Sequence, residues 1–404
     1  MNKQRADLTF KDNLRKGRHG WVRLTPAYSV KLVHQILEEH PQIERILDPF
    51  SGTGTTGLVA GQRGLHCDLY DINPFLIWLA RVKCDNYSVE QIDRTRANAN
   101  IIVKLANENS SLEQALWIPP ISNIERWWSQ DRLLPLARIF HALNSVVPNP
   151  CREKNLLLIA FCRSLIQWSN AAFNHQSMSF ANEDKQLRLF GAEEEIIQNF
   201  LAEVEMILGA ASAYIPGNTQ AFVADSKNGN LDQCQPYDAV ITSPPYANRM
   251  SYIRELRPYM YWLGYLKKSR DAGELDWQAI GGTWGIATSK LKTWKPHDAY
   301  NDIPRLDPLI KEIARSSDVL SRYVHKYFND ISQHLESIHK RLAPQGKVFY
   351  VVGNSKFYDT LISVEEIYAD LMSKYGFENI NVQVIRKRNS KKELFEYIVS
   401  ADKI

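Results

Sequence analysis

Two short segments of the sequence carry residue types that could hold a ligand and support chemistry on it. The first, Asp48-Pro-Phe-Ser-Gly-Thr-Gly-Thr-Thr-Gly57, follows an apolar run and precedes another. Its glycines at 52 and 54 have no Cβ, so the backbone can turn sharply and approach a ligand closely. A G-x-G-x-x-G loop after a strand, followed about 20 residues later by an acidic residue, is typical of nucleoside-binding sites, where the carboxylate accepts ribose hydroxyls. Asp71 is that residue, and an ordinary helix-capping loop is the alternative.

The residues before the glycines separate two classes of nucleoside cofactor. Dinucleotide-binding folds usually enter the first glycine directly from an apolar strand and bind a pyrophosphate at the helix N-terminus. Here the carboxylate of Asp48 stands at the strand end, where it would repel a pyrophosphate. A zwitterionic methionine tail beside a cationic sulfonium tolerates such a carboxylate. The residues before the glycines therefore favour S-adenosylmethionine as the cofactor.

The second segment is Ser243-Pro-Pro-Tyr246 at the end of an apolar run. Two prolines cannot continue a strand ladder, and each residue before a proline is held extended. The Ser243 hydroxyl and the Pro244 carbonyl would then be two rigid acceptors, able to orient a nucleobase amino group and stabilise positive charge that develops on it. The Tyr246 ring offers a surface on which an extruded base could stack. A rigid turn without a chemical role is the alternative.

Together these segments resemble motifs I and IV of the S-adenosylmethionine-dependent methyltransferases that modify exocyclic amino groups of DNA, cytosine N4 or adenine N6. Asp71-Ile-Asn resembles their motif II, Asp225 fits motif III, and residues 20–37 resemble motif X. The resemblance implies that S-adenosylmethionine is the cofactor and that the catalytic residues are Ser243, Pro244, Pro245 and Tyr246. It implies a cofactor site made of Thr25, Tyr28, Asp48, Phe50, Ser51, Gly52, Gly54, Thr55, Asp71, Asn73 and Asp225.

The expected reaction is direct methyl transfer to a flipped base, without a covalent intermediate. Cytosine C5 methylation uses a cysteine that follows a proline, and Cys151 alone has that context, far from both motifs. In the family, Ser-Pro-Pro is commoner in cytosine-N4 enzymes, so cytosine N4 is expected. Adenine N6 and an RNA amino group remain alternatives. A nicotinamide-dependent oxidoreductase and an inactive DNA-binding protein are further rivals, disfavoured by the intact second segment.

The surrounding sequence predicts the elements that position these segments. Apolar runs that end in Gly, Pro, Asp or Asn predict seven strands, and helical patterns over 56–63, 74–83 and 327–342 lie between them. This βαβ alternation predicts an α/β fold with a mostly parallel sheet, an antiparallel edge hairpin and helical insertions. The family resemblance implies that this fold is of the Rossmann-like class I methyltransferase type, with a seven-stranded sheet. The strands are expected within 44–50, 64–72, 219–226, 237–245, 346–354, 379–388 and 393–402.

Three segments are expected to form the methyltransferase core, residues 1–90, 216–261 and 326–404. The helical insertion 91–215 is a candidate for target recognition, and 262–325 is a candidate for DNA contact. Basic residues beside aromatic ones suit phosphates and unstacked bases. We therefore expect Arg249, Arg254 and His175 to contact DNA.

Composition sets the context of the site. The chain has 404 residues, a net charge of +4 and 23% charged residues, which fits a globular protein and permits a nucleic-acid partner without demanding one. The family resemblance implies that this partner is double-stranded DNA. No apolar stretch is long enough to span a membrane, the N-terminus lacks a signal-peptide core, and the five cysteines form no CxxC pair. We expect a cytoplasmic protein without a bound metal. No nuclease-like acidic cluster is evident, so any cognate restriction endonuclease would be a separate protein.

Overall fold

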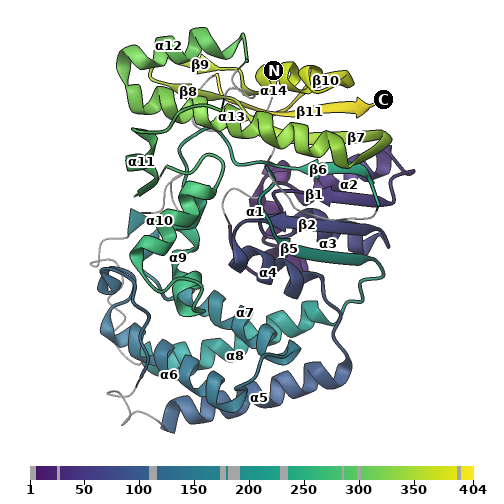
Figure 1. Ribbon diagram of the computed structural model, residues 1–404. Helices are drawn as coiled ribbons and strands as arrows, with labels where there is room; N and C mark the ends of the chain where they lie inside the picture. The colour runs from purple at the N-terminus through teal and green to yellow at the C-terminus, as the bar shows by residue number, and fades with distance from the viewer. Residues whose placement is uncertain are drawn as a thin grey trace.

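A seven-stranded sheet forms the centre of the computed structural model (Figure 1). The structure describes residues 6–24, 28–108, 116–172, 179–180, 192–227, 235–283, 286–297, 302–388 and 393–404. All seven strands lie where the apolar runs predict them. They are β1 (Arg45–Asp48), β2 (His66–Asp71), β5 (Asn218–Val223), β6 (Tyr237–Thr242), β7 (Leu342–Gly353), β10 (Phe377–Lys387) and β11 (Phe395–Lys403).

The strand order is β10-β11-β7-β6-β1-β2-β5. The last five strands in this order are mutually parallel, whereas β11 runs antiparallel to both of its neighbours. The predicted antiparallel hairpin is thus confirmed, with β11 inserted beside β7 and β10 left as the edge strand. This mixed sheet confirms the Rossmann-like class I methyltransferase fold. The order reverses between β1 and β6, and ligands of such sheets bind at the carboxyl ends of the strands beside that point.

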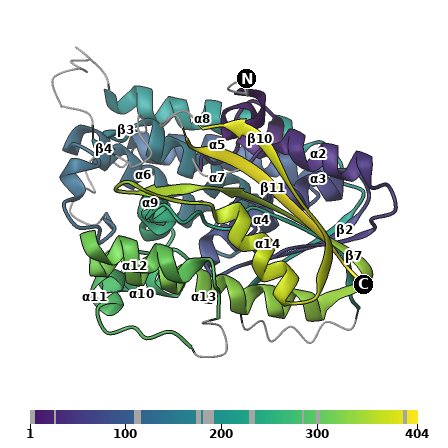
Figure 2. The same ribbon diagram turned by 90° about the horizontal axis from the view of Figure 1, so that it is seen from above.

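Helices cover both faces of the sheet because successive strand residues point to opposite sides. Ile46 packs with α2 (Val30–Glu39) and α3 (Thr55–Gln62), and its neighbour Leu47 packs in the cluster formed by α13 (Asp318–Arg341) and α14 (Val364–Lys374). Figure 2 shows α14 lying against the β10–β11 hairpin. Helix α13 begins nine residues before the predicted start of 327, so it crosses the expected boundary at 325.

The predicted helical insertion consists of α5 (Val89–Glu108), α6 (Gln130–Val146), α7 (Arg152–Gln167) and α8 (Ala192–Ala211), which lie below the sheet in Figure 1. Their apolar core also contains residues of α4 (Pro74–Cys84) and α9 (Tyr252–Trp262). Trp262, 1% exposed, packs against Trp128, Phe140 and Phe161 there. Helix α9, expected in the methyltransferase core, therefore packs into the insertion, because its Tyr and Trp residues are buried among the insertion helices.

The second insertion contains α10 (Ser269–Gln278), α11 (Ile286–Leu291) and α12 (Leu306–Ser316). None of the helices within the described ranges combines the length and the apolar character that a membrane span requires. Shorter elements complete the description: η1 (Ala6–Leu8), α1 (Phe10–Asn13), η2 (Gly17–Gly20), η5 (Ile124–Arg126), β3 (Ala171–Ala172), β4 (Ser179–Phe180), β8 (Ser355–Phe357) and β9 (Thr360–Ile362).

Candidate active site

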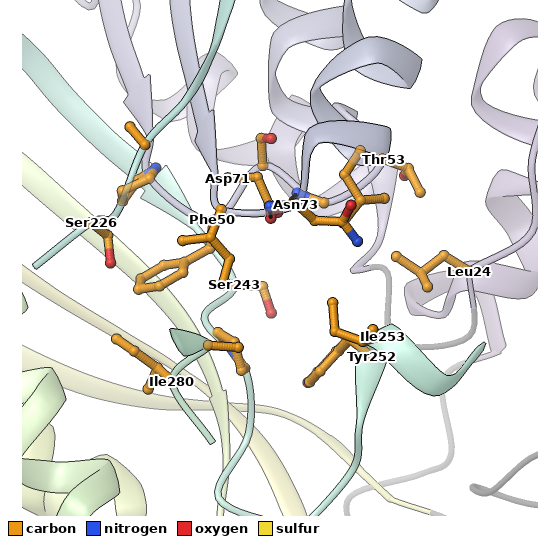
Figure 3. Close-up of a pocket in the computed structure, with 18 of the residues that line it drawn as sticks. Leu24, Phe50, Thr53, Asp71, Asn73, Ser226, Ser243, Tyr252, Ile253 and Ile280 are labelled. Carbon is orange, nitrogen blue, oxygen red and sulfur yellow. Dashed lines mark hydrogen bonds between the residues drawn. The ribbon is translucent and has the colours of Figure 1, made fainter. Parts of the chain in front are cut away.

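A cavity opens beside the carboxyl ends of β1, β2, β5 and β6 (Figure 3). It encloses about 880 Å³ of space, counting the part open to solvent. Ser243 and Pro245, which follow β6, line the same cavity as the glycine loop. The fold therefore brings the two segments singled out in the sequence to one site. The other predicted residues that line the cavity are Tyr28, Phe50, Ser51, Gly52, Thr55, Asp71, Asn73 and Asp225.

The glycine loop has the backbone geometry that its sequence requires. Gly52 and Gly54 have φ angles of 50° and 77°, a region that side chains with a Cβ rarely adopt. Gly54 is also the N-cap of α3. A Cβ on Gly57 would lie 2.6 Å from Leu69 Cδ1, so this third glycine lets α3 pack directly on the sheet.

The Asp71 carboxylate is fixed by the backbone on both sides of it. One oxygen accepts from the Gly52 N–H at 3.1 Å, and the other accepts from the Asn73 N–H at 2.9 Å. Burial raises the pKa of Asp71 to about 7, although these two hydrogen bonds favour the charged form. A carboxylate in this position can still accept from ligand hydroxyls, because each oxygen has two lone pairs.

Ser51 and Phe50 give the cavity wall one polar group and one apolar surface for a ligand. The Ser51 hydroxyl oxygen is buried and has no hydrogen-bond partner among the described residues. A buried hydroxyl without a partner costs free energy, so a ligand atom that pairs with it would bind favourably. Phe50 supplies an apolar surface next to it and packs against His334 with ring centroids 4.7 Å apart. Burial lowers the pKa of His334 to about 3, so this imidazole is neutral.

Asp48 and Gly54 were predicted to contact the cofactor, but neither residue lines the cavity. The Asp48 side chain is fully buried and accepts from the hydroxyls of Thr56 at 2.5 Å and Thr242 at 2.6 Å. It thereby joins β1, α3 and β6 underneath the loop. Gly54 lies against α4, where a Cβ would be 3.0 Å from the Ala80 Cβ. Both residues shape the loop from below.

Ser243 has the hydrogen bonding that an acceptor requires. Its hydroxyl donates to the Val351 carbonyl of β7 at 3.1 Å. A hydroxyl has one proton and two lone pairs, so lone-pair density remains for a donor in the cavity. Pro245, the next residue but one, is fixed through its carbonyl, which accepts from the Tyr327 hydroxyl at 2.8 Å.

Tyr246 and Pro244 also differ from expectation, because they do not line the cavity. The Tyr246 hydroxyl donates to Glu396 at 2.8 Å, and the Arg388 guanidinium lies over the ring, 5.3 Å from its centroid. In this structure the Tyr246 ring therefore faces the β10–β11 hairpin. Pro244 is buried beside it.

Several cavity residues escaped sequence analysis. Tyr252 and Ile253 begin α9, and the segment 278–280 consists of the last residue of α10 and the two residues after it (Figure 3). The Tyr252 hydroxyl accepts from the Tyr246 N–H at 3.1 Å, which braces the Pro-Pro turn. Lys227 links the segment 278–280 to the site. Its ammonium donates to the Gln278 carbonyl at 3.3 Å and lies 3.5 Å from the carboxylate of the cavity residue Asp225. The only early signal was the aromatic run that contains Tyr252.

The two predicted DNA contacts that the structure describes, Arg249 and Arg254, do not line the cavity but are close in sequence to residues that do. Arg249 is exposed and has a φ of 61°, with its N–H donating to the Tyr323 hydroxyl at 3.1 Å. Arg254 lies half-buried in the first turns of α9. Thr25 and His175 fall outside the described residues. Within the described ranges, no group of three or more His, Cys, Asp or Glu side chains could hold a metal ion.

Known DNA methyltransferases are similar to this chain in sequence. The family described as D12 class N6 adenine-specific DNA methyltransferase matches residues 30–111, which include the glycine loop and Asp71 but end far before Ser243. The type II methyltransferase M.BsoBI of Geobacillus stearothermophilus is 22% identical, over 96% of this chain and 85% of its own length. M.AvaI of Nostoc sp. is 23% identical over 96% and 86%, and M.MvaI of Kocuria varians is 20% identical over 88% and 80%.

Proposed function

We propose that this chain, a member of the exocyclic-amino DNA methyltransferases, transfers a methyl group from S-adenosylmethionine to a base amino group in double-stranded DNA. The observation that carries the proposal is the shared cavity, because Asp71 and Ser243 line the same space. A nucleoside held at Asp71 and an amino group held at Ser243 would meet within it. The type II methyltransferases that align with almost the whole chain support the same activity.

The cavity fits the proposed cofactor. The Asp71 carboxylate would accept from the ribose hydroxyls, and the Ser51 hydroxyl, which has no partner among the described residues, would pair with the polar methionine end. Phe50, Ile72 and Ile280 line the cavity and would form apolar walls for the adenine ring. When bound, S-adenosylmethionine supplies a methyl group on a sulfonium.

The residues after β6 would activate the acceptor. The amino nitrogen of cytosine or adenine is conjugated with its ring and is a poor nucleophile. Hydrogen bonds from that group to acceptors on this turn, of which the Ser243 hydroxyl lines the cavity, would turn its lone pair toward the methyl group. They would also stabilise the positive charge that develops on the nitrogen as the new N–C bond forms and the S–CH3 bond breaks, until the nitrogen releases a proton to water. The hydrogen bond from Ser243 to Val351 keeps the hydroxyl in the accepting orientation.

We propose cytosine N4 as the methylated group, on the basis of the serine at position 243. Adenine N6 is the second candidate, favoured by the description of the matching family. That match ends at residue 111, so it contains no residue of the target-base side of the cavity. The description therefore bears on the cofactor side more than on the base.

DNA would bind across the mouth of the cavity. Arg249, exposed beside the catalytic turn, and Arg254 are proposed to contact phosphates there. The helical insertion lies next to them through α9 and is the proposed reader of the target sequence. A cognate restriction endonuclease, if the chain serves in a restriction–modification system, would be a separate partner.

The direct test is transfer of a tritiated methyl group from S-adenosylmethionine to genomic DNA and to total RNA, followed by nucleoside mass spectrometry. The proposal predicts label in DNA as N4-methylcytosine. N6-methyladenine would keep the mechanism and replace the base. Label confined to RNA, or no transfer by a protein that still binds the cofactor, would refute the proposed function.

A further inference from the structure

The Tyr246 ring is held rigidly at the target-base side of the site. Its hydroxyl donates to Glu396, a buried residue whose carboxylate also accepts from the Arg386 guanidinium at 2.7 and 3.1 Å. Its backbone N–H is bound by the Tyr252 hydroxyl. The orientation of this ring is therefore set by the β10–β11 hairpin and by α9, before any DNA is bound.

Arg388, the residue after β10, occupies the space over that ring. Its guanidinium carbon lies 5.3 Å from the ring centroid, within the ~6 Å range of a cation–π contact. Its Nη1 donates to the Asn354 carbonyl at 3.0 Å. Asn354 is fixed in turn, because its side chain bonds the backbone of Glu393 and Phe395.

Gly353 leaves the space in which the Tyr246 ring and the Arg388 guanidinium lie against each other. A Cβ on Gly353 would lie 2.9 Å from Tyr246 Cε2 and 2.8 Å from Arg388 Nη1. Any side chain at position 353 would therefore push the ring or the guanidinium away. The absence of one at the end of β7 keeps both in place.

The charge of Arg388 is left without a matching carboxylate in the part of the chain that the structure describes. The nearby Glu396 is already paired with Arg386 on the same hairpin. A guanidinium has five N–H donors, and one of them, on Nη1, is used on the Asn354 carbonyl. The other four, at Nε, Nη1 and Nη2, would be satisfied by acceptor atoms of a ligand that enters beside Tyr246.

We propose that Arg388 is a target-base residue. In the DNA-free protein its guanidinium covers the ring on which the extruded base would stack. When the base enters, the guanidinium moves to the base edge and donates to its ring-nitrogen or carbonyl acceptors. Both cytosine and adenine present such acceptors. This inference rests on the proposed function, because it requires that a base leaves the duplex.

The test compares two duplexes that differ only at the target position. The first carries the site at which the wild-type protein places its methyl group, found by sequencing DNA that it has methylated. The second has an abasic residue in place of the target base. Dissociation constants are measured with S-adenosylhomocysteine present, so that no turnover occurs. The variants are Arg388→Ala, Arg388→Lys and the matched control Lys387→Ala, which removes a charge from the neighbouring position of the same strand.

Arg388→Ala is expected to weaken binding of the base-containing duplex about tenfold, as for loss of a good base-edge contact, and to leave the abasic duplex within about twofold. Arg388→Lys should fall between wild type and Arg388→Ala, and Lys387→Ala should affect both duplexes equally. An equal loss on both duplexes with Arg388→Ala, or no loss on either, would overturn the inference. Unchanged S-adenosylhomocysteine binding shows that the variants are folded. Failure of the proposed function would appear in the wild type itself, as absent methyl transfer to DNA.

Discussion

The two sides of the cavity are built in different ways. On the cofactor side the contact between Gly52 and Asp71 is local in sequence, over 19 residues. On the target side the contacts join distant segments, Ser243 to Val351 over 108 residues and Tyr246 to Glu396 over 150. The glycine loop and Asp71 thus belong to one βαβ unit, which β6 supports from below through Asp48, whereas the target side also needs β7 and the edge hairpin.

This difference implies that the two sides can be disabled separately. Buried polar groups fix the cofactor side from below, with Asp48 bridging β1, α3 and β6. The target side is braced by hydroxyl groups and by a stacked guanidinium near the surface. Mutations should therefore divide into those that change cofactor affinity and those that change transfer to DNA. Each prediction below tests that division.

The largest effect is expected for Ser243→Ala. Loss of one preorganised group that stabilises transition-state charge costs about 10²–10³-fold in rate in comparable sites. Methyl transfer to DNA should fall by about that factor, while the dissociation constant of S-adenosylmethionine stays within about twofold of wild type. Single-turnover kinetics and equilibrium dialysis measure the two quantities. A parallel loss of cofactor affinity would show that the two sides are not separable.

Asp71→Ala should have the converse effect. Hydrogen bonds to a charged group contribute about 1.5–3 kcal/mol, so cofactor affinity should fall about 10- to 150-fold. Transfer at saturating cofactor should change far less. An unchanged dissociation constant, measured by dialysis, would remove Asp71 from the ribose site.

The raised pKa of Asp71 adds a pH test of the same residue. Burial places this pKa at about 7, so the acceptor carboxylate is progressively protonated below that pH. Cofactor affinity should therefore weaken as the pH falls from 8 to 6, by at most about tenfold per pH unit. Asp71→Asn has no such group and should show a flat profile. A wild-type profile equally flat would contradict the assignment.

Two glycines with similar backbone angles test how tightly the cofactor side is packed. Gly54 and Gly64 have φ angles of 77° and 80°, but a Cβ would meet Ala80 at 3.0 Å only at Gly54. Gly64→Ala should cost about 1–2 kcal/mol of unfolding free energy, from left-handed backbone strain alone. Gly54→Ala should cost about 1–3 kcal/mol more, because the loop must shift. Equal losses in urea denaturation would mean that α4 does not constrain the loop.

The smallest effect is expected for substitution of Arg249, which does not line the cavity. Arg249→Gly removes an exposed charge and also relieves a φ of 61°. Stability should be unchanged or rise by up to about 1 kcal/mol. DNA affinity should fall a few-fold, with the salt dependence of log Kd reduced by about one phosphate contact. Unaltered salt dependence would show that Arg249 does not touch the DNA backbone.

The same contrast explains what the sequence could predict. All seven strands and the edge hairpin follow from apolar runs and turn residues, and the glycine loop with Asp71 follows from spacing within one unit. The position of α9 in the insertion core could not be predicted, because burial of Trp262 depends on partners from α6, from α7 and from the loop before α6. The orientation of Tyr246 escaped prediction for the same reason, since Glu396 and Arg388 lie at the far end of the chain. The residue pattern within one segment predicts the local geometry of that segment. Contacts between segments that are distant in sequence can be identified only once the fold is known.

One measurement tests the central claim most directly, a crystal structure of the protein with S-adenosylhomocysteine. The account predicts the ribose hydroxyls on the Asp71 carboxylate, the adenine between Phe50 and Ile280, and the thioether sulfur facing Ser243. Density for the ligand outside this cavity, or with its sulfur turned away from Ser243, would contradict the claim that one cavity joins the cofactor to the target base.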